Sequence, residues 1–462
     1  MVSAQRSAAL SLGIDFGTTN SSVALAHPDG RVELARFPAA AALTESFRSV
    51  LYIERAKAAG HTRMKSFTGP TAIERYLDAE EGDHSRGRLI QSLKSHLASR
   101  TLTGTEVFGK HYSIEALIAR ILTDLRVAAE EQFAQPIRHA TVGRPVRFVG
   151  AETDEADTFA LTRLRDAFTQ AGFESVAFEL EPVAAAHSYE ATLDHDELIL
   201  IGDFGGGTSD FSLLRVGPQA RLQRNSNAPS GLLGNAGLGL AGDAFDARII
   251  RKLVSPALGA DSYERQSATV GINGPKLIPA VPAWIYANLE RWHYLSFLKT
   301  RNVAEILRGA RARADQPKKV AALISLIEED LGYQLHQAVE RLKLELSRAE
   351  TARFRFHDGS MEIEAEVTRA DFERWIADDL AAIEGCVDTL LADAHVAPEA
   401  VDRVFLTGGT SFVPAVRRIF TARFPDRIAS AANARSQTAT ASRVVTGDEF
   451  TSVARGLALS TI

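Results

Sequence analysis

The chain is poor in cysteine and has neither a long apolar run nor a long basic tract. Its single cysteine, Cys386, excludes an internal disulfide and is typical of a reducing compartment, so we expect a cytoplasmic protein. No stretch approaches the roughly 18 uninterrupted apolar residues of a membrane span, so no membrane partner is expected. The net charge of −6 argues against nucleic acid as the main partner. The twelve histidines show no metal-ligand spacing, so nothing indicates zinc.

The chain is long and apolar enough to form more than one hydrophobic core. Its 462 residues are 45% hydrophobic, which is typical of a globular protein with two or more cores. A short apolar run near the start, within Met1–Gly13, leads directly into a strand pattern. We therefore interpret it as structure and not as a signal peptide.

The most informative positive feature is a loop that occurs twice. Residues 12–25 read LGIDFGTTNSSVAL, and residues 200–214 read LIGDFGGGTSDFSLL. Each is an apolar strand, the triplet Asp-Phe-Gly, a turn of small residues and a second apolar strand. The aspartates of the two triplets, Asp15 and Asp203, are 188 positions apart, which suggests two similar halves. Two such hairpins would hold a polyphosphate from both sides.

The residue types in these loops suit phosphate and magnesium. Glycine and threonine at a hairpin tip leave backbone N–H groups free for phosphate oxygens, and the hydroxyls add donors. A carboxylate at the same turn is repelled by phosphate but holds Mg²⁺, usually through the waters of the metal. We therefore expect Asp15, Asp203 and Asp210 around one Mg²⁺. The alternative is that each segment is an ordinary glycine-containing β-hairpin. Neither loop is a P-loop, because a strand and not a helix follows each turn.

The rest of the pattern predicts an α/β architecture. Short strands alternate with turns over 12–53, whereas 56–110 is irregular and charged. An amphipathic helix capped by Ser113 is predicted over 113–133. The elements that follow are a strand at 140–143, a helix at 155–171, a strand at 176–180 and a small-residue helix that opens at 181–186.

The longest helical pattern covers 318–350 and has two distinct faces. Its apolar stripe, at heptad-like spacing, consists of Ile327, Leu331, Leu335, Leu342 and Leu346. This stripe favours packing against the protein's own sheet, with a coiled-coil dimer as the alternative. The opposite face carries Glu340, Lys343, Leu344 and Ser347. The apolar Leu344 is unusual there; a flat ligand such as an adenine ring would explain it, and so would an ordinary surface leucine.

Three further segments are candidates for binding. Residues 237–246 form a glycine-rich turn into a helix, a third candidate for phosphate contact. Residues 404–414 predict a strand, a diglycine turn and a helix start, where only glycines would let a purine nucleoside lie against the backbone. An aromatic cluster follows three prolines and consists of Trp284, Tyr286, Trp292, Tyr294 and Phe297. Such a cluster is most often core, and the alternative is a protein-partner surface over 275–300.

Taken in order, these segments resemble the ATPase unit of DnaK-type heat-shock chaperones, within the actin and sugar-kinase superfamily. The matching segments span nearly the whole chain and are 13–20, 181–186, 203–210, 242–246, 340–347, 408–410 and 448–449. The resemblance implies an α/β fold of two actin-like lobes, each ribonuclease H-like, with a nucleotide cleft between them. Lobe I would comprise 1–190 and 443–462, and lobe II would comprise 191–442, with an enlarged insertion over about 247–385.

The resemblance also implies roles for individual residues, with ATP or ADP and Mg²⁺ as cofactors and K⁺ as a further candidate. Asp15, Asp203 and Asp210 would hold the Mg²⁺ shell together with Glu181. The implied catalytic residues are Lys94, Glu181, Asp203 and Thr208. Lys94 would lie near the γ-phosphate and the attacking water; the alternative is a solvated surface lysine. The other implied nucleotide contacts are Gly17, Thr18, Thr19, Asn20, Gly205, Gly206, Gly207, Gly242, Asp243, Glu340, Lys343, Leu344, Ser347, Gly408, Gly409, Thr410, Phe412 and Asp448.

The chain departs from the family pattern at three places. The two arginines that sandwich the adenine in the family are replaced by Leu344 and Phe412, so stacking on Phe412 would hold the purine. Residues around 256–325 look inserted relative to the family. The chain stops 14 residues after Asp448, with nothing that resembles a peptide-binding domain, and so is similar to the shortened YegD-type relatives.

Two functions follow as hypotheses. The first is a Mg²⁺-dependent ATP-binding protein with slow ATP hydrolysis, a chaperone-like ATPase module without a substrate-binding domain. The second is a nucleotide-sensing scaffold with little or no turnover. A small-molecule kinase ranks lower, because no aspartate base can be named beyond the metal set, and an actin-like filament former is also conceivable.

Overall fold

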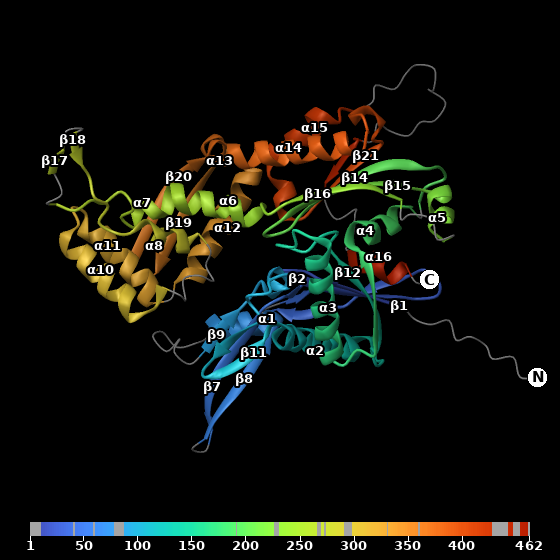
Figure 1. The fold of residues 1–462 in the computed structure, drawn as a ribbon, viewed down its shortest axis with the longest axis horizontal. Helices are drawn as coiled ribbons and strands as arrows, with labels where there is room; N and C mark the ends of the chain where they lie inside the picture. Colours follow the sequence, from blue (N-terminus) through green and yellow to red (C-terminus); the bar gives the residue numbers. More distant parts are fainter. Residues whose placement is uncertain are drawn as a thin grey trace, which may run out of the picture. The chain divides into compact units, whose positions relative to one another are not determined.

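Two sheets with the same strand order form the framework of the computed structural model (Figure 1). The first runs in the order β13 (Ser175–Leu180), β12 (His139–Arg144), β1 (Ser11–Phe16), β2 (Asn20–Ala26) and β3 (Val32–Leu34), and β6 (Phe47–Arg48) pairs with β2. The second runs in the order β22 (Val444–Thr446), β21 (Arg403–Thr407), β14 (Glu197–Phe204), β15 (Ser209–Val216) and β16 (Leu232–Leu238). In each sheet three consecutive strands are antiparallel, and two later strands add in parallel. The repeated loop of the sequence therefore joins equivalent strands of two equivalent sheets.

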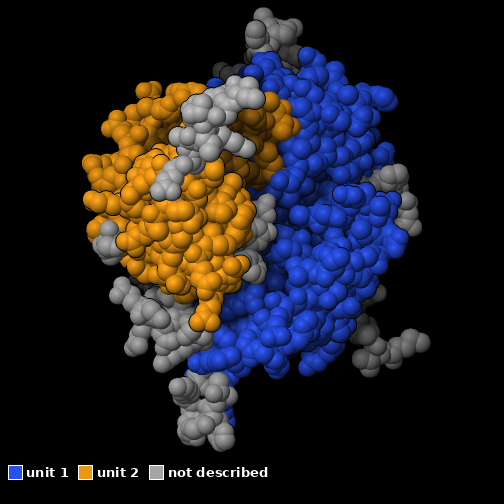
Figure 2. Space-filling view, turned by 60° about the vertical axis from the view of Figure 1, so that its left-hand side comes forward, with its two compact units in different colours: residues 1–239, 384–412, 416–462 blue, residues 240–383, 413–415 orange. Residues whose placement is uncertain are grey.

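The chain divides into two units (Figure 2). Unit 1 comprises residues 1–239, 384–412 and 416–462, and unit 2 comprises residues 240–383 and 413–415. The structure describes residues 11–39, 42–58, 61–77, 87–190, 192–225, 231–265, 269–271, 274–290, 298–329, 331–358, 361–426, 442–446 and 453–460.

Helices and smaller sheets complete unit 1. Its further strands are β4 (Phe37–Ala39), β5 (Ala42–Thr44), β7 (Leu51–Ala58), β8 (His61–Thr68), β9 (Gly87–Ile90), β10 (Gly104–Val107) and β11 (Lys110–Ser113). Its helices are α1 (Gly69–Leu77), η2 (Leu93–His96), α2 (Ile114–Phe133), α3 (Asp154–Gln170), α4 (Glu181–Glu190), α5 (Pro218–Asn225), η5 (Pro398–Ala400), η6 (Gly409–Phe412) and α16 (Val453–Leu459). Two helices have residues in both units, α14 (Ala377–Asp393) and α15 (Pro414–Arg423).

Unit 2 is mainly helical. Its helices are α6 (Gly242–Ile249), η3 (Ile250–Val254), α7 (Ser255–Ala257), α8 (Ala283–Leu289), α10 (Arg301–Arg313), α11 (Pro317–Glu328), α12 (Gly332–Arg348) and α13 (Arg369–Trp375). Its strands are β17 (Thr269–Gly271), β18 (Gly274–Lys276), β19 (Thr351–Asp358) and β20 (Met361–Thr368). The helix α12 packs against β19, and the rings of Phe245 and Phe372 meet edge to face in the core.

Several sequence predictions are confirmed in unit 1. The helix predicted at 113–133 is α2, and the Ser113 hydroxyl accepts a hydrogen bond from the Ala116 backbone N–H at 3.1 Å, as an N-cap does. The predicted strand at 140–143 lies within β12, and the predicted helix at 155–171 is α3 to within a residue at each end. The apolar stripe of α2, which includes Leu117 and Ile121, is fully buried in the core beneath β1 and β2.

Two sequence predictions are wrong. Residues 56–110, expected to be irregular, contain β8, α1, β9, η2 and β10, because short strands and a 3₁₀ turn leave little periodicity to read. The long helix predicted at 318–350 is two helices, α11 and α12, with a break before Gly332. Its stripe is nevertheless buried within the unit: Ile327, Leu331, Leu335, Leu342 and Leu346 are each at most 6% exposed. Packing against the protein's own sheet, the favoured interpretation, is confirmed by the contact of α12 with β19.

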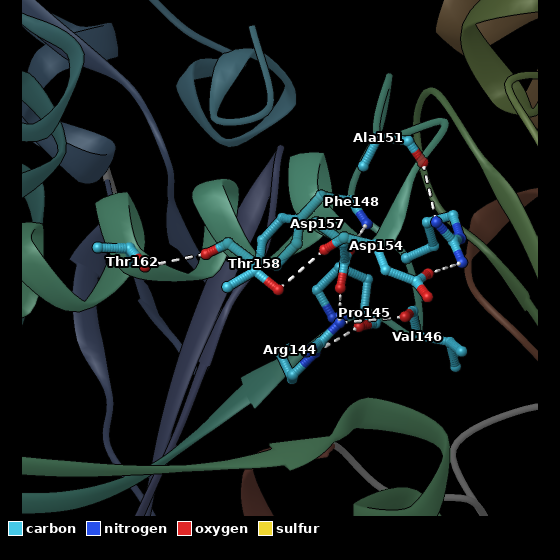
Figure 3. A network of polar contacts seen from close by, with 10 residues as sticks. Arg144, Pro145, Val146, Phe148, Ala151, Asp154, Asp157, Thr158 and Thr162 are labelled. Atoms are coloured by element: carbon cyan, nitrogen blue, oxygen red, sulfur yellow. Dashed lines mark hydrogen bonds and ion pairs between the residues drawn. The ribbon is translucent and has the colours of Figure 1, made fainter. Parts of the chain in front are cut away.

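A polar network fixes the chain where it leaves β12 (Figure 3). The Arg144 guanidinium donates to the backbone carbonyls of Pro145 and Val146 and forms an ion pair with Asp157 on α3. The second carboxylate oxygen of Asp157 accepts a hydrogen bond from the Phe148 backbone N–H at 2.9 Å. The strand β12 lies between β1, which carries Asp15, and β13, which Glu181 follows. The network therefore fixes the chain at the carboxyl end of the sheet, where these two side chains are positioned.

The short helix α16 packs directly on β1 and on α4 because a glycine lies at each of the two contacts. A Cβ on Gly13 would lie 2.2 Å from the Ala454 carbonyl oxygen, and a Cβ on Gly456 would lie 1.7 Å from the Ala184 carbonyl oxygen. Real Cβ atoms do not approach oxygen this closely. The helix α16 therefore joins β1 and α4 at van der Waals distance, and both glycines are required for it.

We predict that Gly456→Ala destabilises the protein by about 1–3 kcal/mol or more, because the added methyl group overpacks a backbone contact. The matched control is Gly385→Ala in α14, where a Cβ would meet nothing within 4 Å. That control should be neutral or stabilising by up to about 1 kcal/mol. Urea unfolding followed by circular dichroism measures both, and equal midpoints for the two variants would contradict the prediction.

Candidate functional site

The first predicted phosphate loop lies at the end of β1 in unit 1. Asp15 is opposite Ser22 in the β1–β2 pairing, and residues 17–19 form the turn between the two strands. Ser49 stabilises the turn, because its backbone N–H donates a hydrogen bond to the Thr19 carbonyl at 2.9 Å. Thr19 and Asn20 are exposed, and Thr18 is half-buried. The loop therefore presents hydroxyl groups and backbone on a fixed support.

The second predicted loop repeats this arrangement at the end of β14. Asp203 and Asp210 are directly opposite each other in the β14–β15 pairing. The turn is closed by the Gly205 backbone N–H, which donates to the Thr208 carbonyl at 2.9 Å. Gly205 and Gly207 are exposed, so the backbone at the tip is accessible to a ligand.

A third turn, at the end of β21, lies beside the second loop because β21 pairs in parallel with β14. Gly408 has φ of +82°, and a Cβ there would lie 2.0 Å from the Phe204 carbonyl oxygen, so only glycine fits. The hydroxyl of Thr407 donates to the Asp203 carboxylate at 2.7 Å. Sequence reasoning missed Thr407 as a site residue. Thr407 lies opposite Asp203 only because β21 and β14 pair in this parallel register, and the residues next to Thr407 in the sequence do not indicate that pairing.

Lys94 is a buried residue and not a surface lysine. Its side chain is 8% exposed, and its ammonium donates to the Glu181 carboxylate at 2.8 Å. The two residues come from different elements, Lys94 from the 3₁₀ helix η2 and Glu181 from the first residue of α4. Ser92, just before η2, adopts a left-handed conformation with φ of 56°, which turns the chain into this position.

The charges in this part of unit 1 are strongly coupled. The pKa of Asp15 is raised to about 7, mainly by burial; the nearby charges of Glu181 and Asp203 act in the same direction, and that of Lys94 opposes them. Burial likewise raises the pKa of Asp210 to about 7 and raises the pKa of Asp203. Burial acts to lower the pKa of Lys94, but the charges of Glu181, Asp15 and Asp203 together raise it. Four carboxylates thus share a single buried ammonium.

This excess of negative charge fits a hydrated divalent cation. Among the described residues, no three acidic, histidine or cysteine side chains converge closely enough to grip a metal ion directly. Mg²⁺ keeps several of its waters and takes only one or two carboxylates, so a set of spaced aspartates suits it better than a closed cage. The residues that would hold it through its waters are Asp15, Asp203 and Asp210.

Unit 2 brings together another part of the predicted set. Gly242 and Asp243 begin α6, and the Lys343 ammonium of α12 lies 2.7 Å from the Asp246 carboxylate of α6. It also donates to the Gly242 carbonyl at 3.4 Å. Lys343 therefore holds α6 against α12. The predicted set on α12 also includes Glu340 and Ser347, and the Ser347 hydroxyl donates to the Leu344 carbonyl.

The two positions that depart from the family pattern are exposed apolar side chains. Leu344, on α12 in unit 2, is 49% exposed, and Phe412, at the end of η6 in unit 1, is 44% exposed. The Arg417 guanidinium lies 5.8 Å from the centre of the Phe412 ring. Of the neighbouring residues at this turn, Thr410 is buried and the Ser411 hydroxyl is bonded to the Gly408 carbonyl at 2.6 Å.

Some of the predicted residues are not part of the site as the structure describes it. Asp448 lies outside the described residues, as do Trp292, Tyr294 and Phe297 of the aromatic cluster. The two described members of that cluster differ. Tyr286 is buried and donates to the Leu258 carbonyl, whereas Trp284 is 47% exposed. None of the described helices has the length and apolar character needed to cross a membrane.

We predict that the free energy of unfolding depends on pH through the titration of Asp15. Because its pKa is raised to about 7 from an ordinary value of 3.8, the folded protein keeps a proton that the unfolded chain has lost between these pH values. The free energy of unfolding should therefore fall as the pH rises through this window, with up to about 1.4 kcal/mol per pH unit from this group. In Asp15→Asn that contribution disappears, whereas Asp393→Asn, at an exposed position on α14, should keep it. Urea unfolding at pH 5, 6, 7 and 8 measures this, and parallel curves for wild type and Asp15→Asn would contradict it.

Comparison with known proteins gives one family and related chaperones. The family model described as Hsp70 protein matches residues 11–262 and 321–441. The chaperone protein DnaK of Thermosipho africanus is 26% identical over 410 residues, which cover 88% of this chain and 54% of the relative. The chaperone protein DnaK of Thermosipho melanesiensis is 26% identical over 409 residues, with the same coverage. The chain thus spans about half the length of these curated relatives.

The family match covers both predicted phosphate loops, the segment that opens α4 and the turn after β21. The unmatched interval 263–320 lies within the segment that the sequence suggested to be inserted. The paired sheets agree with the duplicated α/β architecture that the sequence predicted. The chain belongs to the Hsp70 family and has the actin-like α/β fold of that family.

Proposed function

We propose that this protein is a Mg²⁺-dependent ATP-binding module that hydrolyses ATP slowly. The observation that carries the proposal is the gathering of Asp15, Asp203 and Asp210 with the Lys94–Glu181 pair in unit 1. Two loops with accessible glycine and threonine residues flank this group, and both are supplied by the same kind of hairpin. Such a set suits a triphosphate, which needs many donors and compensation of its negative charge.

In this proposal the chain's own residues act by positioning and electrostatics. Backbone N–H groups of the loops, with the hydroxyls of Thr18, Thr19 and Thr208, bind phosphate oxygens and stabilise the charge that develops on them. Lys94 orients the attacking water near the terminal phosphate. Glu181 and the three aspartates fix the surrounding water shell. The metal, when bound, neutralises phosphate charge.

The Lys94–Glu181 ion pair accounts for slow turnover. An ammonium bonded at 2.8 Å to a carboxylate has fewer donors for a water molecule or a phosphate oxygen. Hydrolysis then requires Glu181 to release Lys94, or both to share the water. The same observation favours a second candidate function, a nucleotide-sensing scaffold in which the pair stays closed and turnover is negligible.

The nucleoside end of the site belongs to the same proposal. Stacking on the exposed ring of Phe412 would hold the base, and the turn at Gly408, Gly409 and Thr410 would lie against the sugar. The remaining proposed contacts are Gly242, Asp243, Glu340, Lys343, Leu344, Ser347 and Asp448. Because Thr410 is buried and Ser411 is already bonded, this turn has few side-chain groups to read the edge of a base.

Several finer expectations stay predictions. These are the lobe boundaries at 190, 191 and 443, the enlarged insertion over about 247–385, the similarity to the shortened YegD-type relatives, and K⁺ as a further ion. A protein partner at 275–300 and a cytoplasmic location complete this group; Trp284 is the exposed aromatic side chain among the described residues of that segment.

We predict that single-turnover hydrolysis of labelled ATP with Mg²⁺ falls by about 10²-fold or more in Lys94→Ala, as the loss of a positioned catalytic group would give. Asp203→Ala should abolish Mg²⁺-dependent turnover. Lys65→Ala, at an exposed position of β8, is the control and should retain the wild-type rate. Circular dichroism of each variant checks that it is folded.

The outcome separates the two candidate functions. Nucleotide binding with no turnover in wild type supports the scaffold. An unchanged rate in both Lys94→Ala and Asp203→Ala would overturn the assignment of the site.

We predict that Phe412→Ala weakens nucleotide binding by roughly 5- to 150-fold, the range expected for losing about 1–3 kcal/mol of base stacking. Phe412→Trp should retain binding, because a larger flat ring still stacks. If stacking and not edge recognition holds the base, ATP and GTP should bind within about tenfold of each other, since flat rings are tolerated alike. Titration with fluorescent ATP and GTP analogues measures both. Leu222→Ala, at an exposed apolar residue on α5, is the control and should bind as wild type does.

A further inference from the structure

The interval 263–320, which the family model does not match, has a charge opposite to that of the rest of the chain. It contains ten lysines and arginines against four aspartates and glutamates, a net charge of +6 in a chain of net −6. The remaining residues therefore carry −12. Exposed basic side chains in such an interval would favour an acidic partner.

A groove lies between two helices of this part of unit 2. The helices α10 and α11 lie side by side (Figure 1), and residues 314–316 connect them. The groove has a volume of about 190 Å³, and its apolar lining is Leu298, Val303, Ala304, Leu307, Ile324 and Ile327. A dry cavity of about 150 Å³ accommodates one benzene ring, so this volume suits one or two apolar side chains.

The rim of the groove is mainly basic. Lys299 and Arg301 stand at the end where α10 begins, and Glu328 is the acidic residue of the rim. Arg308 and Arg311 continue from Arg301 along α10, because positions 301, 304, 308 and 311 fall on one helix face. All three arginines are exposed.

These three guanidinium groups make no ion pair with any residue that the structure describes. Nearby basic residues differ in this respect. Arg313 is bonded to Glu264 at 2.8 Å, and Lys319 lies 3.1 Å from both oxygens of Asp261. The unit thus uses some of its basic side chains internally, whereas Arg301 at the rim and Arg308 and Arg311 farther along the same face of α10 are exposed.

We propose that the groove between α10 and α11 binds a short amphipathic, acidic segment of a partner protein. Apolar side chains of that segment enter the groove, and its carboxylates lie along Arg301, Arg308 and Arg311. Charge complementarity selects an acidic partner. The aliphatic lining selects a peptide over a nucleic acid, whose backbone offers nothing to an apolar groove.

The test is fluorescence anisotropy of a labelled 14-residue amphipathic peptide with leucine at positions i, i+3, i+4 and i+7, glutamate at four positions that are not four apart, and alanine elsewhere. Binding should weaken at least tenfold when the glutamates are replaced by glutamine or the leucines by serine. It should also weaken as the salt concentration rises from 50 to 500 mM, because the contacts of the exposed arginines are screened.

Variants of the full chain locate the binding surface. Arg308→Glu with Arg311→Glu should weaken peptide binding at least tenfold, and Ile324→Ser should weaken it without changing the charge. The control is Arg63→Glu with Lys65→Glu on β8, which has the same net charge change at exposed positions of unit 1 and should bind as wild type does. These measurements need no nucleotide, so they stand apart from the test of ATP hydrolysis.

Four results would overturn the proposal. The first is that the peptide does not bind, and the second is that the control variant loses as much binding as Arg308→Glu with Arg311→Glu. The third is that a labelled RNA oligonucleotide binds in place of the peptide and that the Arg308→Glu, Arg311→Glu variant abolishes this binding. The fourth is that the wild-type protein sediments as a dimer that the same variant dissociates. The third would make the surface a nucleic-acid site, and the fourth an interface between copies of this chain.

Discussion

The candidate site depends on one electrostatic constraint, the placing of four carboxylates around a single buried lysine. Asp15, Asp203, Asp210 and Glu181 repel one another, and burial removes the water that would screen them. Lys94 offsets part of this repulsion through its ion pair with Glu181. Burial, together with this repulsion, raises the pKa of Asp15 and of Asp210 to about 7, which favours the protonated form of both groups. Perturbed carboxyl groups at the ends of central strands are typical of ligand-binding and catalytic sites.

The two similar sheets are what make this cluster. In each of them the first strand ends with the Asp and Phe of the Asp-Phe-Gly triplet, and a parallel strand lies beside that first strand. The parallel neighbours contribute in different ways. The strand β12 pairs with β13, and Glu181 comes directly after β13 in the chain. The strand β21 ends at Thr407, whose hydroxyl donates a hydrogen bond to Asp203. The helix α16 then binds β1 to α4 through glycine contacts that leave no room for a side chain. Rigid elements, and not flexible loops, therefore set the positions of the charged groups.

Membership of the Hsp70 family and the chain's own departures from that family are separate findings. The family match covers the loops and the carboxylates of unit 1. The departures are apolar side chains at Leu344 and Phe412, and a basic interval around α10 that the family model does not match. The first kind of change alters how a nucleoside would be held, by stacking on a ring in place of contact with an arginine. The second adds a surface of opposite charge away from the phosphate loops in sequence. A common fold does not by itself fix function, so the two departures bear on function independently of the family match.

The sequence by itself determined the elements and residues whose signals are local. The repeated Asp-Phe-Gly loops, the helix capped by Ser113 and the diglycine turn after β21 follow from turn residues, caps and periodicity within a few positions. The same local signals failed over 56–110, where strands are short, and at Gly332, where one apolar stripe continues through a helix break. Only the tertiary structure decided that Lys94 is bonded to Glu181, 87 positions away, and that Thr407 is bonded to Asp203, 204 positions away. Strand register and helix packing bring such residues together, and the shifted pKa values arise from that burial, so no pattern of neighbouring residues could have revealed either.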